Sequence, residues 1–306
     1  MSIPNDHERR YIVITPVRDG ERYLETTIQS MLHQTVRPEK WIIVDDGSLD
    51  GTPEILRHHA EHCDWIQILS IELREERASW AGGIYAFLRG YELIAETDFD
   101  FVANLDSDLE LPEDYFERLI KEFQSDHSLG IASGVYLENG SDGWRPVIMP
   151  PYHAAGASKM LRKQCYSDIG GFVPTRGWDT VDEIRAQYVG WKTKHFPELQ
   201  FRHLRGEGVK IGSLRTQVLH GEVYFLSGGG IAFFLLKVLD RAVRQKPVLV
   251  ASLAMAWGYL RCWASGRKRL VGKAEARFYR RLLNQRLRAV VAKLVGRAGP
   301  RTEVWV

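Results

Sequence analysis

The stretch Tyr11-Ile-Val-Ile-Thr15, ended by Pro16, decides the fold class, because a short run of apolar and β-branched residues is typical of a strand buried on both faces. Apolar residues from Leu24 to Leu32 then follow at the spacing of an amphipathic helix. A second buried strand is expected at Trp41-Ile-Ile-Val44. Strand, helix and strand together predict a βαβ unit.

The same alternation continues through the first 125 residues and predicts an open, mostly parallel α/β sheet with helices on both faces. Thr52 before Pro53 is the pattern of a helix N-cap, and this helix is expected to run to about His62. The later elements expected here are a strand at 65–69, a helix within 78–95, a strand at 99–105 and a helix after Pro112.

The pattern loosens after Gly130. We expect a strand near 131–137, a Gly/Pro-rich loop at 139–151, helices near 162–168 and 180–189, and a strand or loop leading to 201–205. Two apolar stretches follow at 223–239 and 247–260, and Ser227-Gly-Gly-Gly230 interrupts the first. The sequence therefore predicts an α/β domain at 1–210 and a helical, basic C-terminal region at 211–306.

The composition is that of an ordinary globular protein. Of the 306 residues, 44% are hydrophobic and 26% charged, which excludes wholesale disorder, a collagen-like repeat and a disulfide scaffold. Cys63, Cys165 and Cys262 are far apart, which suits a reducing, cytoplasmic setting. The first ten residues are polar and charged, unlike a secretory signal peptide.

The formal net charge of +2 conceals a strongly basic C-terminal segment. Residues 261–306 hold thirteen Lys or Arg against Glu275 and Glu303, a net charge of +11, which leaves −9 for the rest of the chain. The most apolar parts, 223–236 and 247–260, have about 14 residues each, fewer than the roughly 20 that cross a bilayer. With aromatic residues among its cations, this region is expected to hold the protein on the anionic cytoplasmic face of a membrane. The alternative is a solvated basic face on helices that pack against the α/β domain.

Chemistry is expected where the strands end, because open α/β sheets bind ligands beyond their carboxyl ends. Asp106 and Asp108 follow such a strand and can both reach one Mg²⁺ or Mn²⁺. A triplet of this kind is often only a solvated turn, but its place after a buried strand, beside a second acidic pair at Asp45-Asp46, favours a metal site. The turn at 15–20 is not Gly-x-Gly-x-x-Gly, and no Gly-Lys-Ser/Thr loop occurs, which disfavours nicotinamide dehydrogenases and P-loop NTPases.

Four segments carry a resemblance to a known family. They are Ile12-Val-Ile-Thr-Pro-Val-Arg-Asp-Gly20, Ile28-Gln-Ser-Met-Leu-His-Gln-Thr35, Ile42-Ile-Val-Asp-Asp-Gly-Ser-Leu-Asp-Gly-Thr52 and Leu105-Asp-Ser-Asp-Leu-Glu-Leu-Pro112. In these segments the chain resembles the family-2 glycosyltransferases of GT-A fold, over about residues 11–203. The resemblance implies a nucleotide-sugar donor, a UDP-sugar before others, bound with Mg²⁺ or Mn²⁺, and inversion at the anomeric carbon.

The resemblance also implies which residues hold the donor and the metal. The metal is expected at Asp106 and Asp108, with His203 as a third ligand or a phosphate contact; the alternative for His203 is a structural role beside Arg202 and Arg205. Arg77-Ala-Ser-Trp-Ala-Gly-Gly83 departs from the Lys/Arg-rich segment, ending in Ala-x-Asn, that the family shows before its metal motif. The residues expected around the nucleotide and its diphosphate are Thr15, Pro16, Val17, Asp19, Asp46, Arg77 and Asp106.

Inversion by a single displacement needs a carboxylate near the acceptor hydroxyl as general base. Asp179, Asp182 and Glu183 are the candidates, in a segment that resembles the family's Glu-Asp pair at a helix start, where the helix dipole favours an ionised carboxylate. The spacing back from Gly190 favours Asp179, whereas the acidic pair itself favours Asp182 and Glu183. Some of these carboxylates are alternatively helix caps.

The sequence therefore predicts an inverting, metal-dependent glycosyltransferase that transfers sugar from a nucleotide-sugar to a saccharide or lipid-linked acceptor in cell-surface polysaccharide synthesis. No nucleic-acid partner is expected, and the oligomeric state stays open. A sugar-nucleotide nucleotidyltransferase is the rival enzyme, but the turn at 15–20 is not the Gly-rich, Arg/Lys-containing loop expected of one. A carbohydrate- or nucleic-acid-binding protein dominated by its basic tail is the non-catalytic alternative.

Overall fold

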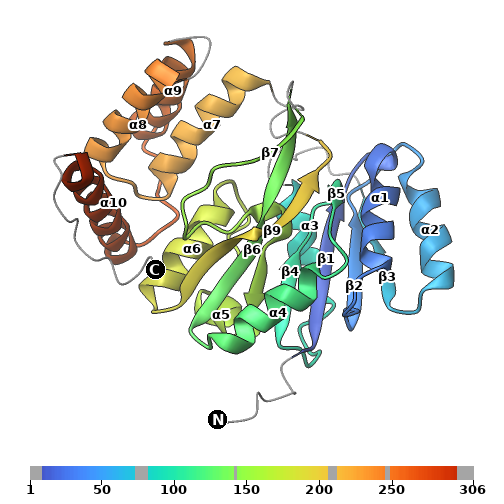
Figure 1. The fold of residues 1–306 in the computed structure, drawn as a ribbon. Helices are drawn as coiled ribbons and strands as arrows, with labels where there is room; N and C mark the ends of the chain where they lie inside the picture. The colour runs from blue at the N-terminus through green and yellow to red at the C-terminus, as the bar shows by residue number, and fades with distance from the viewer. Residues whose placement is uncertain (1–8, 73–81, 141–142, 206–211, 245–248, 295–306) are drawn as a thin grey trace. The chain divides into compact units, whose positions relative to one another are not determined.

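The computed structural model describes residues 9–72, 82–140, 143–205, 212–244 and 249–294. The chain forms two compact units, residues 1–206 and 207–306 (Figure 1). The first unit is an α/β structure and the second is helical in its described part. Arg77, in the segment 73–81, lies outside the described residues.

A mixed sheet forms the centre of the first unit. Its strands lie in the order β3-β2-β1-β4-β8-β6-β9-β5, and β7 pairs with β6 beside this path. The strands are β1 (Tyr11–Val17), β2 (Lys40–Asp45), β3 (Ile66–Ser70), β4 (Phe101–Asn104), β5 (Leu109–Glu110), β6 (Leu129–Gly140), β7 (Gly143–Pro146), β8 (Met160–Arg162) and β9 (Lys192–His203).

The relative direction of neighbouring strands changes after β4. Strands β3, β2, β1 and β4 are parallel neighbours, whereas β8 runs antiparallel to both β4 and β6. From β1 the chain moves outward to β2 and β3, and then crosses back to β4 on the other side of β1. The carboxyl ends of β1 and β4 therefore form a topological switch point, the place where open α/β sheets bind ligands.

Helices cover both faces of the sheet. The helices α1 (Glu21–Leu32), α2 (Thr52–His62) and α4 (Tyr115–Ser125) share one core with Tyr11 and Val13. The helices α3 (Gly82–Glu92), α5 (Lys163–Asp168) and α6 (Trp178–Tyr188) share the other core with Ile12 and Ile14. Because successive strand residues point to opposite faces, β1 serves both cores, which explains its unbroken apolar run. The predicted open α/β sheet with helices on both faces is confirmed, although its second half is mixed.

Three local expectations differ from the structure. The loop predicted at 139–151 contains β7, which pairs with the end of β6. The strand β8 was not predicted, because three buried residues are too few to show a periodic pattern. Thr52 is not an N-cap: α2 has Gly51 there, and the Thr52 hydroxyl instead accepts a hydrogen bond of 2.8 Å from the backbone N–H of Gly20.

The described part of the second unit consists of α7 (Ser213–Leu226), α8 (Ile231–Arg244), α9 (Val250–Ala264) and α10 (Lys273–Leu294). Helices α7 and α9 lie very close together, since a Cβ atom on Gly221 would come within 1.9 Å of the carbonyl oxygen of Met255. A Cβ atom on Gly258 would lie equally close to the carbonyl oxygen of Val218, at 1.9 Å. No described helix combines the length and the apolar character needed to cross a membrane.

Helices α8 and α9 each leave an apolar face open. On α9 this face recurs every three or four residues and consists of Val250, Leu253, Trp257 and Leu260, which are between 43% and 67% exposed, while Met255 on the opposite side is buried. On α8 the exposed apolar residues are Ile231, Leu235, Leu236 and Leu239. We call these two sets the outer faces of α8 and α9.

Candidate active site

Hydrogen bonds join the turns that follow β1 and β2 at the carboxyl edge of the sheet. The backbone N–H of Asp19 donates to the Ser48 hydroxyl at 3.0 Å, and the Asp19 carboxylate accepts the N–H of Leu49 at 2.9 Å. The N–H of Asp46 donates to the Val17 carbonyl at 2.9 Å. Asp19 adopts a positive φ of 49°, which Asp tolerates better than most residues.

The residues predicted to hold the donor nucleotide differ in accessibility. Asp19 is exposed, Pro16 is half-buried, and Asp46 is almost fully buried. Thr15 and Val17 point into the protein, and the Thr15 hydroxyl accepts a hydrogen bond of 2.8 Å from the Trp41 indole. The Thr15 side chain therefore supports the core, and only its backbone is left to face a ligand.

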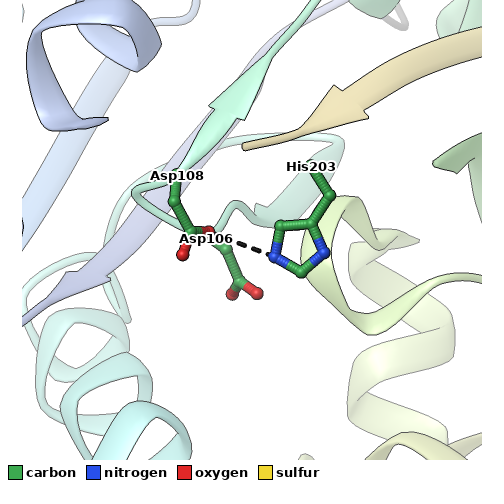
Figure 2. Close-up of side chains that lie close together, drawn as sticks. All are labelled: Asp106, Asp108 and His203. Carbon is green, nitrogen blue, oxygen red and sulfur yellow. Dashed lines mark ion pairs between the residues drawn. The ribbon is translucent and has the colours of Figure 1, made fainter. Parts of the chain in front are cut away.

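The register of β5 against β9 brings the acidic triplet and His203 together. Leu109 lies directly opposite His203, and the N–H of Leu204 donates to the Asp108 carbonyl at 2.8 Å. The His203 Nε2 atom consequently lies 3.3 Å from Asp108 Oδ1. Asp106, Asp108 and His203 offer ligand atoms that all lie within 4.8 Å of one another (Figure 2). We call these three residues the metal cluster.

Hydrogen bonds hold the strand end that carries the metal cluster. The N–H of Asp106 donates to the Ala157 carbonyl at 2.7 Å. The Asn104 side chain donates to the Gly156 carbonyl at 2.7 Å and to Asp106 Oδ1 at 3.4 Å. These contacts fix Asp106 through its backbone and its side chain before any ligand binds.

The electrostatics of the cluster suit a bound cation. Burial, and then the charge of Asp108, raises the pKa of Asp106 to about 7. Burial alone would lower the pKa of His203, but the hydrogen bond to Asp108 and the two negative charges outweigh it and raise that pKa. A divalent cation would relieve the repulsion between the carboxylates.

The available donor atoms also fit a metal ion. Two carboxylates and one imidazole form a donor set that suits Mn²⁺, and Mg²⁺ accepts the same oxygens. The Nδ1 atom of His203 is buried and has no hydrogen-bond partner among the described residues. This nitrogen is therefore available to a bound ligand, or to a metal ion if the imidazole ring turns over. All three residues predicted to bind the metal are thus brought together.

Asp179 lies in the first turn of α6, next to the metal cluster. The helix starts after Gly177, whose φ of 79° requires glycine. A Cβ atom on Gly156 would contact the Asp179 Cβ at 3.5 Å, and Gly156 is the residue bonded to Asn104. The negative charge of Asp179 is one of the causes that raise the pKa of Asp106. Asp179 is half-buried, so part of its side chain meets solvent.

Asp182 and Glu183 lie deeper, in a buried network. Both carboxylates accept hydrogen bonds from Lys159, and Glu183 also accepts bonds from His153 and from the N–H of Ala154. Burial raises the pKa of Asp182 to about 7 despite the opposing charge of Lys159. His153 and Lys159 keep the pKa of Glu183 below its ordinary value even though burial acts against them. These two carboxylates are occupied by protein groups.

Sequence reasoning did not find four residues around the site, namely Asn104, His153, Lys159 and Arg205. Arg205 places its Nε atom 3.5 Å from Asp108 Oδ2. A signal for Arg205 existed, because it stands two residues after His203. Lys159 carried no signal, since it is a single cation before a short apolar run.

A family comparison identifies the chain. The model of the family described as "Glycosyl transferase family 2" matches residues 12–178. The chain belongs to glycosyltransferase family 2. Within this family it is 31% identical over 252 residues to the glycosyltransferase GlyA of Streptococcus pneumoniae serotype 4 (strain ATCC BAA-334 / TIGR4), covering 80% of this chain and 31% of GlyA.

Two other relatives of the family-2 chain match shorter regions. This chain is 30% identical over 131 residues to TuaG of Bacillus subtilis (strain 168), which is named as a putative teichuronic acid biosynthesis glycosyltransferase. The matched region covers 43% of this chain and 48% of TuaG. The chain is 30% identical over 111 residues to the poly-beta-1,6-N-acetyl-D-glucosamine synthase of Staphylococcus aureus (strain COL), covering 36% of this chain and 24% of the synthase. The chain thus spans less than half the length of these relatives.

Solved structures share the fold of this family-2 chain. The mannosyltransferase PcManGT from Pyrobaculum calidifontis, in complex with GDP-Man and Mn²⁺, aligns with a TM-score of 0.53 at 16% identity and covers 94% of this chain and 88% of its own. TarS 1-349 of S. aureus in complex with UDP aligns with a TM-score of 0.50 at 12% identity, covering 84% of this chain and 72% of its own. The GT-A fold predicted from the sequence is confirmed.

Proposed function

We propose that this protein is an inverting, metal-dependent glycosyltransferase that moves a sugar from a nucleotide-sugar donor to a saccharide or lipid-linked acceptor. The observation that carries the proposal is the metal cluster, which stands at the switch point of a GT-A sheet with three ligand atoms within 4.8 Å of one another. The names of TuaG and the N-acetylglucosamine polymer synthase support a role in cell-surface polysaccharide synthesis.

The metal cluster would hold Mn²⁺ or Mg²⁺ through Asp106, Asp108 and His203. When bound, the cation supplies positive charge to the leaving diphosphate of the donor. Arg205, beside Asp108, holds that carboxylate from the other side. The solved complexes of PcManGT with Mn²⁺ and GDP-Man and of TarS with UDP support a metal and a nucleotide as ligands here.

The joined turns after β1 and β2 would hold the nucleoside of the donor. Asp19, Pro16 and Asp46 line this edge beside the metal cluster, and the backbone of 15–17 runs along it. Carboxylates here suit the ribose hydroxyls and the N–H groups of a base, because both are hydrogen-bond donors. We propose a UDP-sugar as the donor to test first.

Asp179 would act as the general base. It is the candidate that is half-buried beside the metal cluster, whereas both oxygens of Asp182 are bonded to protein groups. It lies in the first turn of α6, near the positive end of the helix dipole, and a carboxylate there can accept the proton of the acceptor hydroxyl.

The C-terminal region from about residue 211 would hold the catalytic domain on an anionic membrane at its cytoplasmic face. The outer faces of α8 and α9 offer apolar side chains to a bilayer, and Trp257 and Trp263 suit its headgroup layer. Arg261, Arg267 and Lys268 are exposed near the end of α9 and add attraction to anionic lipids. The net charge of −9 on the rest of the chain argues against nucleic acid as a partner.

The test of this function is metal-dependent donor binding. Unfolding temperatures are measured with UDP-, GDP- and TDP-sugars in Mn²⁺ and again in EDTA. A donor at 100 times its dissociation constant stabilises the protein by about 2.7 kcal/mol, and we expect one nucleotide class to do so only with the metal. Asp106→Ala and Asp108→Ala should abolish this stabilisation, while the exposed control Asp64→Ala should keep it. Equal nucleotide affinity in EDTA would contradict the metal's role.

A further inference from the structure

Lys159 is a fully buried cation between the metal cluster and α6. It follows the short helix η1 (Gly156–Ser158) and immediately precedes β8. Its side chain is 0% exposed. Burying an ammonium group is costly unless its three protons are bound by acceptors, so the identity of those acceptors shows what the residue holds together.

Among the described residues, every hydrogen-bond acceptor of the Lys159 ammonium belongs to the beginning of α6. Its Nζ atom donates to the backbone carbonyl of Asp179 at 2.8 Å, to Asp182 Oδ2 at 2.9 Å and to Glu183 Oε1 at 3.2 Å. The same ammonium lies 5.3 Å from the ring centre of Trp178, which begins the helix. One buried ammonium group therefore forms hydrogen bonds to the first two turns of the helix that carries Asp179.

The backbone around Lys159 is bonded to the opposite side of the site. The N–H of Asn104 donates to the Lys159 carbonyl at 2.9 Å, and the N–H of Asp106 donates to the Ala157 carbonyl at 2.7 Å. The segment 156–159 therefore joins two structures: its backbone holds the strand end with Asp106, and its one buried cation holds the helix with Asp179.

We propose that Lys159 is a positioning residue that sets Asp179 relative to the metal cluster. The proposal rests on the proposed function of Asp179 as general base. A displacement of about 1 Å between reacting groups can cost about 100-fold in rate, so a cation that fixes the first turn of α6 would affect turnover without touching the substrate. A purely structural Lys159 would affect stability alone.

The test needs a variant that keeps the buried charges balanced. Lys159→Met alone would leave Asp182 and Glu183 buried with one cation fewer, so it is combined with Asp182→Asn, which removes one negative charge. Asp182→Asn alone is the reference, since it retains Lys159 and its bond to Asp179. Lys121→Met is the control for loss of a lysine, because the Lys121 side chain is 65% exposed on α4 and, among the described residues, its ammonium forms an ion pair with Glu117 alone.

Steady-state kinetics give the first readout. We expect kcat of Lys159→Met/Asp182→Asn to fall at least about tenfold below that of Asp182→Asn, with the donor dissociation constant within twofold. The second readout adds both changes to Asp179→Asn. If Lys159 acts through Asp179, the loss should nearly vanish in that background, since coupled residues are not additive. A folded double variant with the kcat of Asp182→Asn, or a loss that persists undiminished without Asp179, would overturn the proposal.

Hydrogen exchange separates this proposal from the proposed function. Amides of residues 178–184 should exchange faster in Lys159→Met/Asp182→Asn than in Asp182→Asn, and those of α4 should not change. If no nucleotide-sugar is transferred by the natural protein, or if Asp179→Asn retains full turnover, the proposed function fails and the exchange data still decide whether Lys159 positions α6. Unchanged exchange over 178–184 would refute the positioning role in either case.

Discussion

Asp179 and Asp182 are three residues apart on α6, yet their side chains have different surroundings. Both oxygens of Asp182 are bonded, Oδ2 to Lys159 and Oδ1 to Lys159 and to the N–H of Glu183. Asp179 is half-buried beside Gly156, on the side of the metal cluster. A carboxylate with both oxygens occupied is a poor acceptor for the proton of an incoming hydroxyl.

This contrast predicts different costs for two conservative substitutions. Asp179→Asn should lower turnover by about 10²- to 10⁴-fold, the usual value of a general base, while donor affinity stays unchanged. Asp182→Asn should lower turnover by less than about tenfold, because Lys159 keeps its bonds to Asp179 and Glu183. The measurement is kcat with a working acceptor, with donor binding followed separately. Near-normal turnover in Asp179→Asn would show that the base lies elsewhere.

The sequence predicted that Asp106, Asp108 and His203 form one group, and the structure brings these residues together, but the sequence left the candidates for the proposed base unresolved. Asp106 and Asp108 could be found because they end a strand that its apolar run makes visible. The choice between Asp179 and Asp182 depends on Lys159, which stands 20 residues earlier and makes no local pattern with either. Which carboxylate accepts the hydrogen bonds of a buried lysine depends on the folded structure. The spacing of the residues along the chain therefore could not decide it.

At the level of elements, α3 packs against the sheet through a glycine. A Cβ atom on Gly90 would lie 2.8 Å from Ile14 Cγ2 and 3.0 Å from Val44 Cγ2. Gly83, in the first turn of the same helix, would meet no atom within 4 Å. The two glycines differ in packing while sharing a helix, which makes them a matched pair.

Gly90→Ala should destabilise the protein by about 1–3 kcal/mol, because the added methyl group forces β1 and β2 away from α3. Gly83→Ala should be neutral or stabilising by up to about 1 kcal/mol, since alanine favours the helix more than glycine does. Urea unfolding of the two variants measures both free energies. Equal stabilities for Gly90→Ala and Gly83→Ala would contradict the close packing of α3 on the sheet.

Elements long enough to show a full apolar pattern in the sequence were predictable. Short strands that exist only through pairing with neighbouring strands were not. The apolar run of β1 and the helical period of α4 predicted both elements close to their observed bounds. In β8 three residues form a strand only because β4 and β6 lie on either side of them. Likewise, β7 exists as a strand only by pairing with the end of β6.

At the level of the whole molecule, the outer faces of α8 and α9 predict binding to lipid. The protein should sediment with anionic liposomes at low salt, because each basic side chain near the surface adds roughly 1 kcal/mol of attraction. Part of the bound protein should resist salt and be released by detergent, because apolar side chains insert. Leu253→Gln/Trp257→Gln should remove that salt-resistant part.

The control for this experiment is Ile148→Gln, which removes an apolar side chain that is 98% exposed on the first unit. It should bind liposomes as the natural protein does. A full-length protein that stays in the supernatant with anionic liposomes at low salt would rule out the membrane role and leave the outer faces as contacts for another protein.

The position of β9 between β6 and β5 has a consequence for any shortened version of the protein. The family match ends at residue 178, before Asp179 and before the whole of β9. A truncation at that point would retain Asp106 and Asp108 but would strip β6 of a parallel neighbour and β5 of the strand it pairs with. The bare edge of β6 would then invite pairing between molecules, so such a fragment should aggregate. The end of the family match is therefore not a place at which this chain can be cut.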